Sequence, residues 1–242
     1  MNKIYNPDRK DWLNILKRPT QTVSDIEDVV NEVFAKVEME GDSVLMEYTQ
    51  KFDGVNLKSL QVSESEIAEA ADLVGQELKT AIALAKRNIE AFHKAQETDR
   101  VEVETTNGVL CWQEKRPIQK VGLYIPGGSA PLFSTILMLA VPANISGCSE
   151  IVLCTPPNKE GKVHPAILYT ASLCGVTQIY KVGGIQAIAG MTFGTESISK
   201  VYKIFGPGNQ YVTVAKQIAT KHGVAIDMPA GPSELLVMAD DT

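Results

Sequence analysis

Polar side chains follow glycine-rich turns in the second half of this sequence, where they could contact a ligand. Gln186 follows Gly183-Gly184, Asn209 follows Gly208, and Ser233 follows a Gly-Pro pair. Amide and hydroxyl groups at these places can hydrogen-bond a ligand, or they can cap a helix or a turn. Tyr124 ends an apolar run and offers a ring for stacking and a hydroxyl; a role as a core tyrosine is the alternative. We expect these four side chains to face one binding crevice.

The turn 206–211 resembles the dinucleotide fingerprint G-x-G-x-x-G but departs from it. Its sequence is GPGNQY, so Tyr211 stands where the third glycine belongs. Asp227 lies 19 residues after Gly208, close to the distance at which dinucleotide enzymes carry a ribose-binding acid. Considered alone, the turn is as consistent with a tight connection as with a ligand loop.

Histidines and cysteines give no recognisable catalytic centre. His93, His164 and His222 are not at metal-ligand spacing from other histidines, cysteines or acids, which indicates surface roles. Cys148 and Cys154 could be nucleophiles of an aldehyde-oxidising enzyme, but no base is recognisable nearby and Cys154 lies in an apolar run. Structural thiols are the favoured interpretation, and we predict neither catalytic nor metal-binding residues within these 242 residues.

Alternating strands and helices must position the four candidate side chains. Short apolar runs that end in Gly or Pro predict buried strands; they are 121–125, 151–154, 178–182, 201–205, 224–227 and 235–238. Helical spacing fills the intervals, and residues 132–141 predict a buried helix with Ser129 as its cap and Pro131 in its first turn. The alternation predicts an α/β fold with a mostly parallel sheet, whose ligands bind at the carboxyl ends of the strands.

The first half of the sequence predicts helices followed by a hairpin. Capping boxes begin at Ser24 and Ser63, and residues 78–92 carry an apolar seam for another helix of this chain or of a partner. Asn107-Gly108 between two extended runs predicts a β-hairpin. We therefore divide the chain into a helical region (1–100), a hairpin connector (101–120) and an α/β nucleotide-binding region (121–242). Four of the 18 glycines precede residue 121 and 14 follow it, as expected for this division.

Composition limits the partners. The net charge of −6 and the absence of Lys/Arg clusters argue against nucleic acid. No apolar run reaches the roughly 18 residues of a membrane span, and no signal-peptide pattern is visible, so we expect a cytoplasmic protein.

Several long motifs closely resemble the histidinol dehydrogenase family. They are VGLYIPGGSAPLFSTILMLAVPANISGC, VGGIQAIAGMTFGTESI, KIFGPGNQYVTVAKQ and IDMPAGPSE, which together span residues 121–234. The resemblance implies NAD-dependent oxidation of L-histidinol to L-histidine through the aldehyde, the last step of histidine biosynthesis. It also implies a homodimer, a bound zinc and a Rossmann-like nucleotide domain. The NAD contacts then fall on Tyr124, Gln186 and Asn209, and the substrate contact falls on Ser233.

The resemblance also implies that the zinc ligands and the Glu-His general base of the family lie beyond the segment that matches Asp240. No residue of this sequence can take those roles, so we expect the 242-residue chain alone to lack dehydrogenase activity. Two alternatives remain open at this point. One is an aldehyde dehydrogenase-like oxidoreductase that uses a cysteine, and the other is a non-catalytic NAD-binding fragment.

Overall fold

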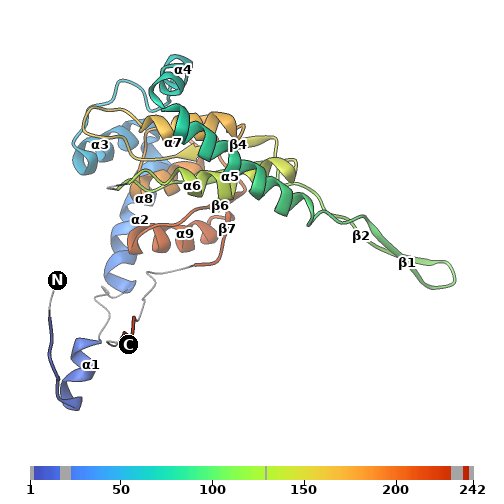
Figure 1. The fold of residues 1–242 in the computed structure, drawn as a ribbon, viewed down its shortest axis with the longest axis horizontal. Coiled ribbons are helices and arrows are strands. Elements are labelled where there is room, and N and C mark those ends of the chain that lie inside the picture. The colour runs from blue at the N-terminus through green and yellow to red at the C-terminus, as the bar shows by residue number, and fades with distance from the viewer. Residues whose placement is uncertain (1–2, 17–22, 129, 230–236, 240–242) are drawn as a thin grey trace.

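The computed structural model describes residues 3–16, 23–128, 130–229 and 237–239. Its centre is a parallel five-stranded sheet in the order β5-β4-β3-β6-β7 (Figure 1). The strands are β3 (Lys120–Tyr124), β4 (Glu150–Cys154), β5 (Gln178–Tyr180), β6 (Lys203–Phe205) and β7 (Ala225–Ile226). The predicted α/β fold with a parallel sheet is confirmed. Residues 235 and 236 of the last predicted run, 235–238, lie outside the described residues, and residues 237 and 238 are not in a strand.

The sheet is buried on both faces because successive apolar residues point in opposite directions. Leu123 and Ile151 belong to one core, whereas Val152 and Ile204 belong to the other. Gly122 allows one helix to approach closely, since a Cβ there would lie 2.6 Å from the sulfur of Met191. The continuous apolar strands are thus explained by a helical layer on each face.

Each helical layer combines segments from both halves of the chain. One face carries α2 (Val23–Glu40), α3 (Asp42–Asp53), α8 (Gly184–Phe193) and α9 (Gln210–Lys221). The other carries α4 (Glu64–Leu73), α5 (Gln76–Lys94), α6 (Phe133–Ile145) and α7 (Pro165–Leu173). A short helix, α1 (Trp12–Ile15), follows a 3-10 turn at Arg9–Asp11. The N-terminal helices therefore cover both faces of the sheet.

The apolar seam of α5 packs inside the chain. Ile82 is 1% exposed and lies in the core that α5 shares with α6, and Leu78, Ala85 and Ile89 pack against the same core. The seam ends before Phe92, which is 65% exposed. Of the two alternatives for the seam, packing on another helix of this chain is confirmed.

The predicted hairpin is confirmed and projects away from the helices and the sheet (Figure 1). β1 (Val101–Thr106) pairs antiparallel with β2 (Val109–Gln113), and Gly108 in the connecting turn has a φ of +81°. Every residue of both strands is exposed.

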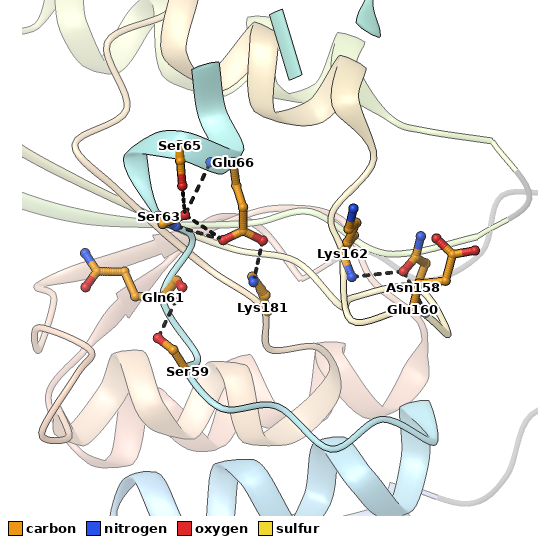
Figure 2. A network of polar contacts seen from close by, with 9 residues as sticks. All are labelled: Ser59, Gln61, Ser63, Ser65, Glu66, Asn158, Glu160, Lys162 and Lys181. Atoms are coloured by element: carbon orange, nitrogen blue, oxygen red, sulfur yellow. Dashed lines mark hydrogen bonds and ion pairs between the residues drawn. The ribbon is translucent and has the colours of Figure 1, made fainter. Parts of the chain in front are cut away.

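The predicted capping box at Ser63 is also confirmed. The Glu66 backbone N–H donates to the Ser63 hydroxyl, and the Ser63 N–H donates to the Glu66 carboxylate at 2.9 Å. The same carboxylate accepts a 2.6 Å bond from Lys181, which follows β5, so α4 is anchored to the sheet edge (Figure 2). The side chain of Ser24, in the other box, lies outside the description.

The helix after β3 begins later than predicted. Its first residue is Phe133, with Leu132 at the N-cap and the Thr135 N–H donating to the Leu132 carbonyl. Pro131 therefore precedes the helix instead of occupying its first turn, and Ser129 lies outside the described residues. Gly127, Gly128, Ala130 and Pro131 lie in the loop before the helix and line a cavity. None of the described helices is both long and apolar enough to cross a membrane.

Candidate functional site

The strand order brings the loops that follow the strands to one edge. β3 lies between β4 and β6, with Tyr124 opposite Cys154 and Leu123 opposite Phe205. The chain moves outward from β3 in one direction through β4 and in the other through β6. Such a reversal opens a crevice at the carboxyl ends of the strands, where α/β sheets bind ligands.

Three of these loops touch one another through glycine. A Cβ on Gly127, after β3, or on Gly183, after β5, would lie 2.6 Å from the ring of Pro156, after β4. A proline ring cannot move aside as a long side chain could. The close contact of these loops therefore depends on the two missing side chains.

Gly206 brings the fourth loop against β3. Its φ is +140°, and a Cβ would lie 2.1 Å from the carbonyl oxygen of Tyr124. No other residue fits this position without a backbone shift. The turn 206–208 therefore lies directly beside the end of the central strand.

Tyr124 links the loops by a hydrogen bond. Its hydroxyl oxygen accepts a 3.0 Å bond from the N–H of Gly184, the first residue of α8, and the residue is 4% exposed. Burial raises the pKa of Tyr124 to about 12, so the hydroxyl is protonated at neutral pH. Because its oxygen is the acceptor here, its own hydrogen remains able to point toward a ligand.

Asn209 and Gln186 occupy the first turns of neighbouring helices. Asn209 is the N-cap of α9, and its side-chain oxygen accepts a 3.1 Å bond from the Val212 N–H. The capping alternative is thus confirmed for this oxygen. Gln186 is 2% exposed, and its side-chain oxygen lies against Gly184. An added Cβ on Gly184 would lie 2.9 Å from that oxygen.

Two adjoining cavities open at this edge. The first, of about 620 Å³, is lined by Tyr124 and by residues after β3 and β4. The second, of about 380 Å³, is lined by Gln186 and Tyr211, among others. Asp53, Gly184 and Asn209 line both cavities. Tyr124, Gln186 and Asn209 therefore come together as expected, whereas Ser233 lies outside the described residues.

Asp227 stabilises the turn 206–208 and does not line a cavity. One carboxylate oxygen accepts a 2.9 Å bond from the Gly206 N–H, and the other is ion-paired with Lys216. Lys216, in turn, donates a 2.7 Å bond to the Gly206 carbonyl and is 6% exposed. This network fixes the turn, and Asp227 lines neither cavity.

Sequence reasoning missed Asp53 and His164. Asp53 ends α3, some 70 positions before the end of β3, and no motif marks it. His164 is the N-cap of α7, where its Nδ1 accepts a 3.2 Å bond from the Ala166 N–H, and it lines the larger cavity. The sequence predicts a surface role for His164, and the residue is exposed. Its place on the cavity wall depends on the loop that precedes α7.

The cysteines do not have the properties of nucleophiles. Cys154 is fully buried in β4, and burial raises its pKa far above the ordinary value of a thiol. Burial also raises the pKa of Cys148. Since the thiolate is the reactive form, both environments oppose nucleophilic catalysis. Within the described ranges, no three His, Cys, Asp or Glu residues are grouped closely enough to hold a metal ion.

Comparison with known proteins agrees with this geometry. The family profile described as histidinol dehydrogenase matches residues 16–242. A histidinol dehydrogenase from Bacteroides fragilis is 60% identical over 242 residues, which are 100% of this chain and 56% of that relative. One from Escherichia coli K12 is 54% identical over 229 residues, 93% of this chain and 52% of that protein.

A solved structure gives the same result. The crystal structure of histidinol dehydrogenase from Elizabethkingia anophelis superposes with a TM-score of 0.87 at 56% identity, covering 94% of this chain and 53% of that one. The chain spans about half the length of the curated relatives it matches. A match over nearly the whole chain at this identity establishes kinship, and the chain belongs to the histidinol dehydrogenase family.

Proposed function

We propose that this chain carries the NAD-binding crevice of an L-histidinol dehydrogenase. The proposed reaction is the NAD-dependent oxidation of L-histidinol to L-histidine through the aldehyde, the last step of histidine biosynthesis. The observation that carries the proposal is the meeting of Tyr124, Gln186 and Asn209 around two adjoining cavities at the strand-order reversal. Membership of the family supports the same activity.

The residues present fit a dinucleotide. The cavities have volumes typical of small-molecule sites, and glycines at 127, 128, 183 and 184 leave part of their walls without side chains. The start of α9 presents N–H groups and a partial positive charge to the crevice, which suits a pyrophosphate. Tyr124 can donate its hydroxyl hydrogen, and the amide nitrogens of Gln186 and Asn209 can donate as well. In this proposal, Ser233 contacts L-histidinol.

The contribution of the described residues is to bind and orient. NAD, when bound, supplies the acceptor for the hydride that leaves the alcohol carbon. Tyr124 stays protonated at neutral pH and therefore acts as a hydrogen-bond donor instead of a base. The described residues do not offer a zinc site, so we derive no step through a metal.

The proposed assembly is a homodimer located in the cytoplasm. The projecting hairpin supports an assembly, because Val103, Leu110 and Trp112 on it are each about half exposed. A two-stranded hairpin is marginally stable alone and gains from packing against another surface. The contact would protect these apolar side chains from water.

A titration of NAD against three forms of the chain tests the proposal. Asn209→Ala removes both the cap and the amide donor, whereas Asn209→Ser keeps a capping oxygen and removes the longer-reaching amide nitrogen. If the amide contacts NAD, both variants weaken binding about fivefold or more, the usual worth of one hydrogen bond. Thermal unfolding should show a larger loss for Asn209→Ala than for Asn209→Ser.

The outcomes are distinct. Absence of NAD binding by the unaltered chain would refute the proposed crevice. Equal affinity of Asn209→Ser and the unaltered chain would remove Asn209 from the NAD contacts. An assay with NAD and L-histidinol asks whether the 242-residue chain is active alone. Formation of NADH would contradict the expected lack of dehydrogenase activity.

A further inference from the structure

Dinucleotide sites in parallel sheets use an acidic residue to hold the ribose next to adenine. The acid usually follows the second strand of the nucleotide-binding unit and accepts a hydrogen bond from the 2′-hydroxyl. The second strand here is β4, and residues 155–158 after it are Thr-Pro-Pro-Asn, with no carboxylate. Glu160 comes later in this loop but does not line either site cavity. The usual source of the acid is therefore missing.

Asp227 does not replace it. Both of its oxygens are engaged, one by the Gly206 N–H and one by Lys216. The carboxylate that does line the site is Asp53, from the N-terminal helices. It shares the larger cavity with Thr155, Pro156 and Asn158, the segment from which the acid would ordinarily come.

The carboxylate of Asp53 is not fully hydrogen-bonded by the described residues. Its Oδ2 atom is buried and has no hydrogen-bond partner among the described residues. It ends α3, so its negative charge lies at the negative end of that helix. Burial raises the pKa of Asp53, as expected for a carboxylate without a compensating partner. Asp53 itself lines both cavities, so a ligand bound there can supply donors to its carboxylate.

From these contacts we infer that Asp53 accepts hydrogen bonds from the hydroxyls of the ribose next to adenine and thereby selects NAD over NADP. The inference rests on the proposed NAD-binding function and names a residue that determines its specificity. A 2′-phosphate would bring negative charge against the carboxylate and would remove the 2′-hydroxyl donor. Lys162 lines the same cavity and is the residue there that could favour a phosphate instead.

Titrations of the unaltered chain and of Asp53→Asn with NAD and with NADP test the inference. The unaltered chain should bind NAD more tightly than NADP. Asp53→Asn should weaken NAD binding roughly tenfold, the scale of one hydrogen bond to a charged group, and should leave NADP binding equal or tighter. Asp72→Asn is the matched control, since Asp72 is exposed on α4 and lines neither cavity.

A thermal-unfolding measurement separates a binding role from a structural one. A structural carboxylate would lower the unfolding temperature when neutralised, whereas Asp53→Asn should keep or raise it. Unchanged NAD affinity in Asp53→Asn, or an equal loss for NAD and NADP, would overturn the ribose assignment while the NAD site stands. If the unaltered chain binds neither dinucleotide, the proposed function fails and the inference fails with it.

Discussion

Two aspartates at the same edge of the sheet lie in opposite environments. Asp227 accepts a bond from the Gly206 N–H and pairs with Lys216, which is 6% exposed. Asp53 has a buried oxygen without a partner, although it borders both cavities. Asp227 is the one at a spacing typical of a ribose-binding acid, and Asp53 has no motif around it.

The difference shows how to separate carboxylates that hold a fold from those that await a ligand. A buried acid whose oxygens are all matched by the protein stabilises its surroundings, and removing one partner leaves an uncompensated charge. A partly buried acid with an unpartnered oxygen, such as Asp53, costs stability and persists where another gain offsets that cost. Spacing in the sequence does not distinguish these cases. The ion pair with Lys216, which Asp227 has and Asp53 lacks among the described residues, does.

The largest effect should come from Lys216→Met. The substitution keeps most of the side-chain volume but leaves Asp227 and the Gly206 carbonyl without their cation, so we expect a loss of about 3 kcal/mol in the free energy of unfolding. Urea denaturation measures it. Lys221→Met on the same helix is the control, because Lys221 pairs with Glu27 at the surface and should cost about 1 kcal/mol or less. Similar losses for the two variants would contradict the structural role of the Asp227 network.

A smaller loss should follow from Gly206→Ala, which tests the turn that Asp227 supports. The added Cβ would lie 2.1 Å from the Tyr124 carbonyl oxygen, and the backbone must shift to avoid it. We expect a cost of about 2–3 kcal/mol, measured by urea denaturation, with weaker NAD binding. Gly75→Ala is the control, since its Cβ would meet no atom within 4 Å and the residue lines neither cavity. A fully stable Gly206→Ala would show that the loop has room to move.

The smallest effect concerns the pH dependence of stability in Asp53→Asn. Burial raises the folded-state pKa of Asp53 above 3.8, its ordinary value. The contribution of this group is therefore fully present below pH 3.8 and is lost as the pH rises through the folded-state pKa. Unfolding of the unaltered chain and of Asp53→Asn between pH 3 and 7 should show Asp53→Asn gaining relative stability with rising pH, by about 1 kcal/mol or less. A gain in the opposite direction would mean that Asp53 has a stabilising partner.

Local patterns in the sequence predicted much of the fold. The Ser63 capping box and the Asn107-Gly108 hairpin formed as expected, because their hydrogen bonds join residues close in the chain. The start of α6 was misplaced by a short distance, since Pro131 precedes the helix. Pro131 lines a cavity together with residues distant in the sequence, an arrangement that local patterns do not reveal.

The sequence by itself determined the βα alternation, the glycine turns after the strands and three side chains that meet at one edge. These features depend on apolar periodicity and on backbone freedom, which are properties of neighbouring residues. Only the tertiary structure decided which acid faces the crevice. Asp53 reaches it because α3 packs against α8 beside the sheet, whereas Asp227 is held by Lys216 from the adjacent α9. The partners of a carboxylate depend on packing between distant segments, and their spacing along the chain does not encode that packing.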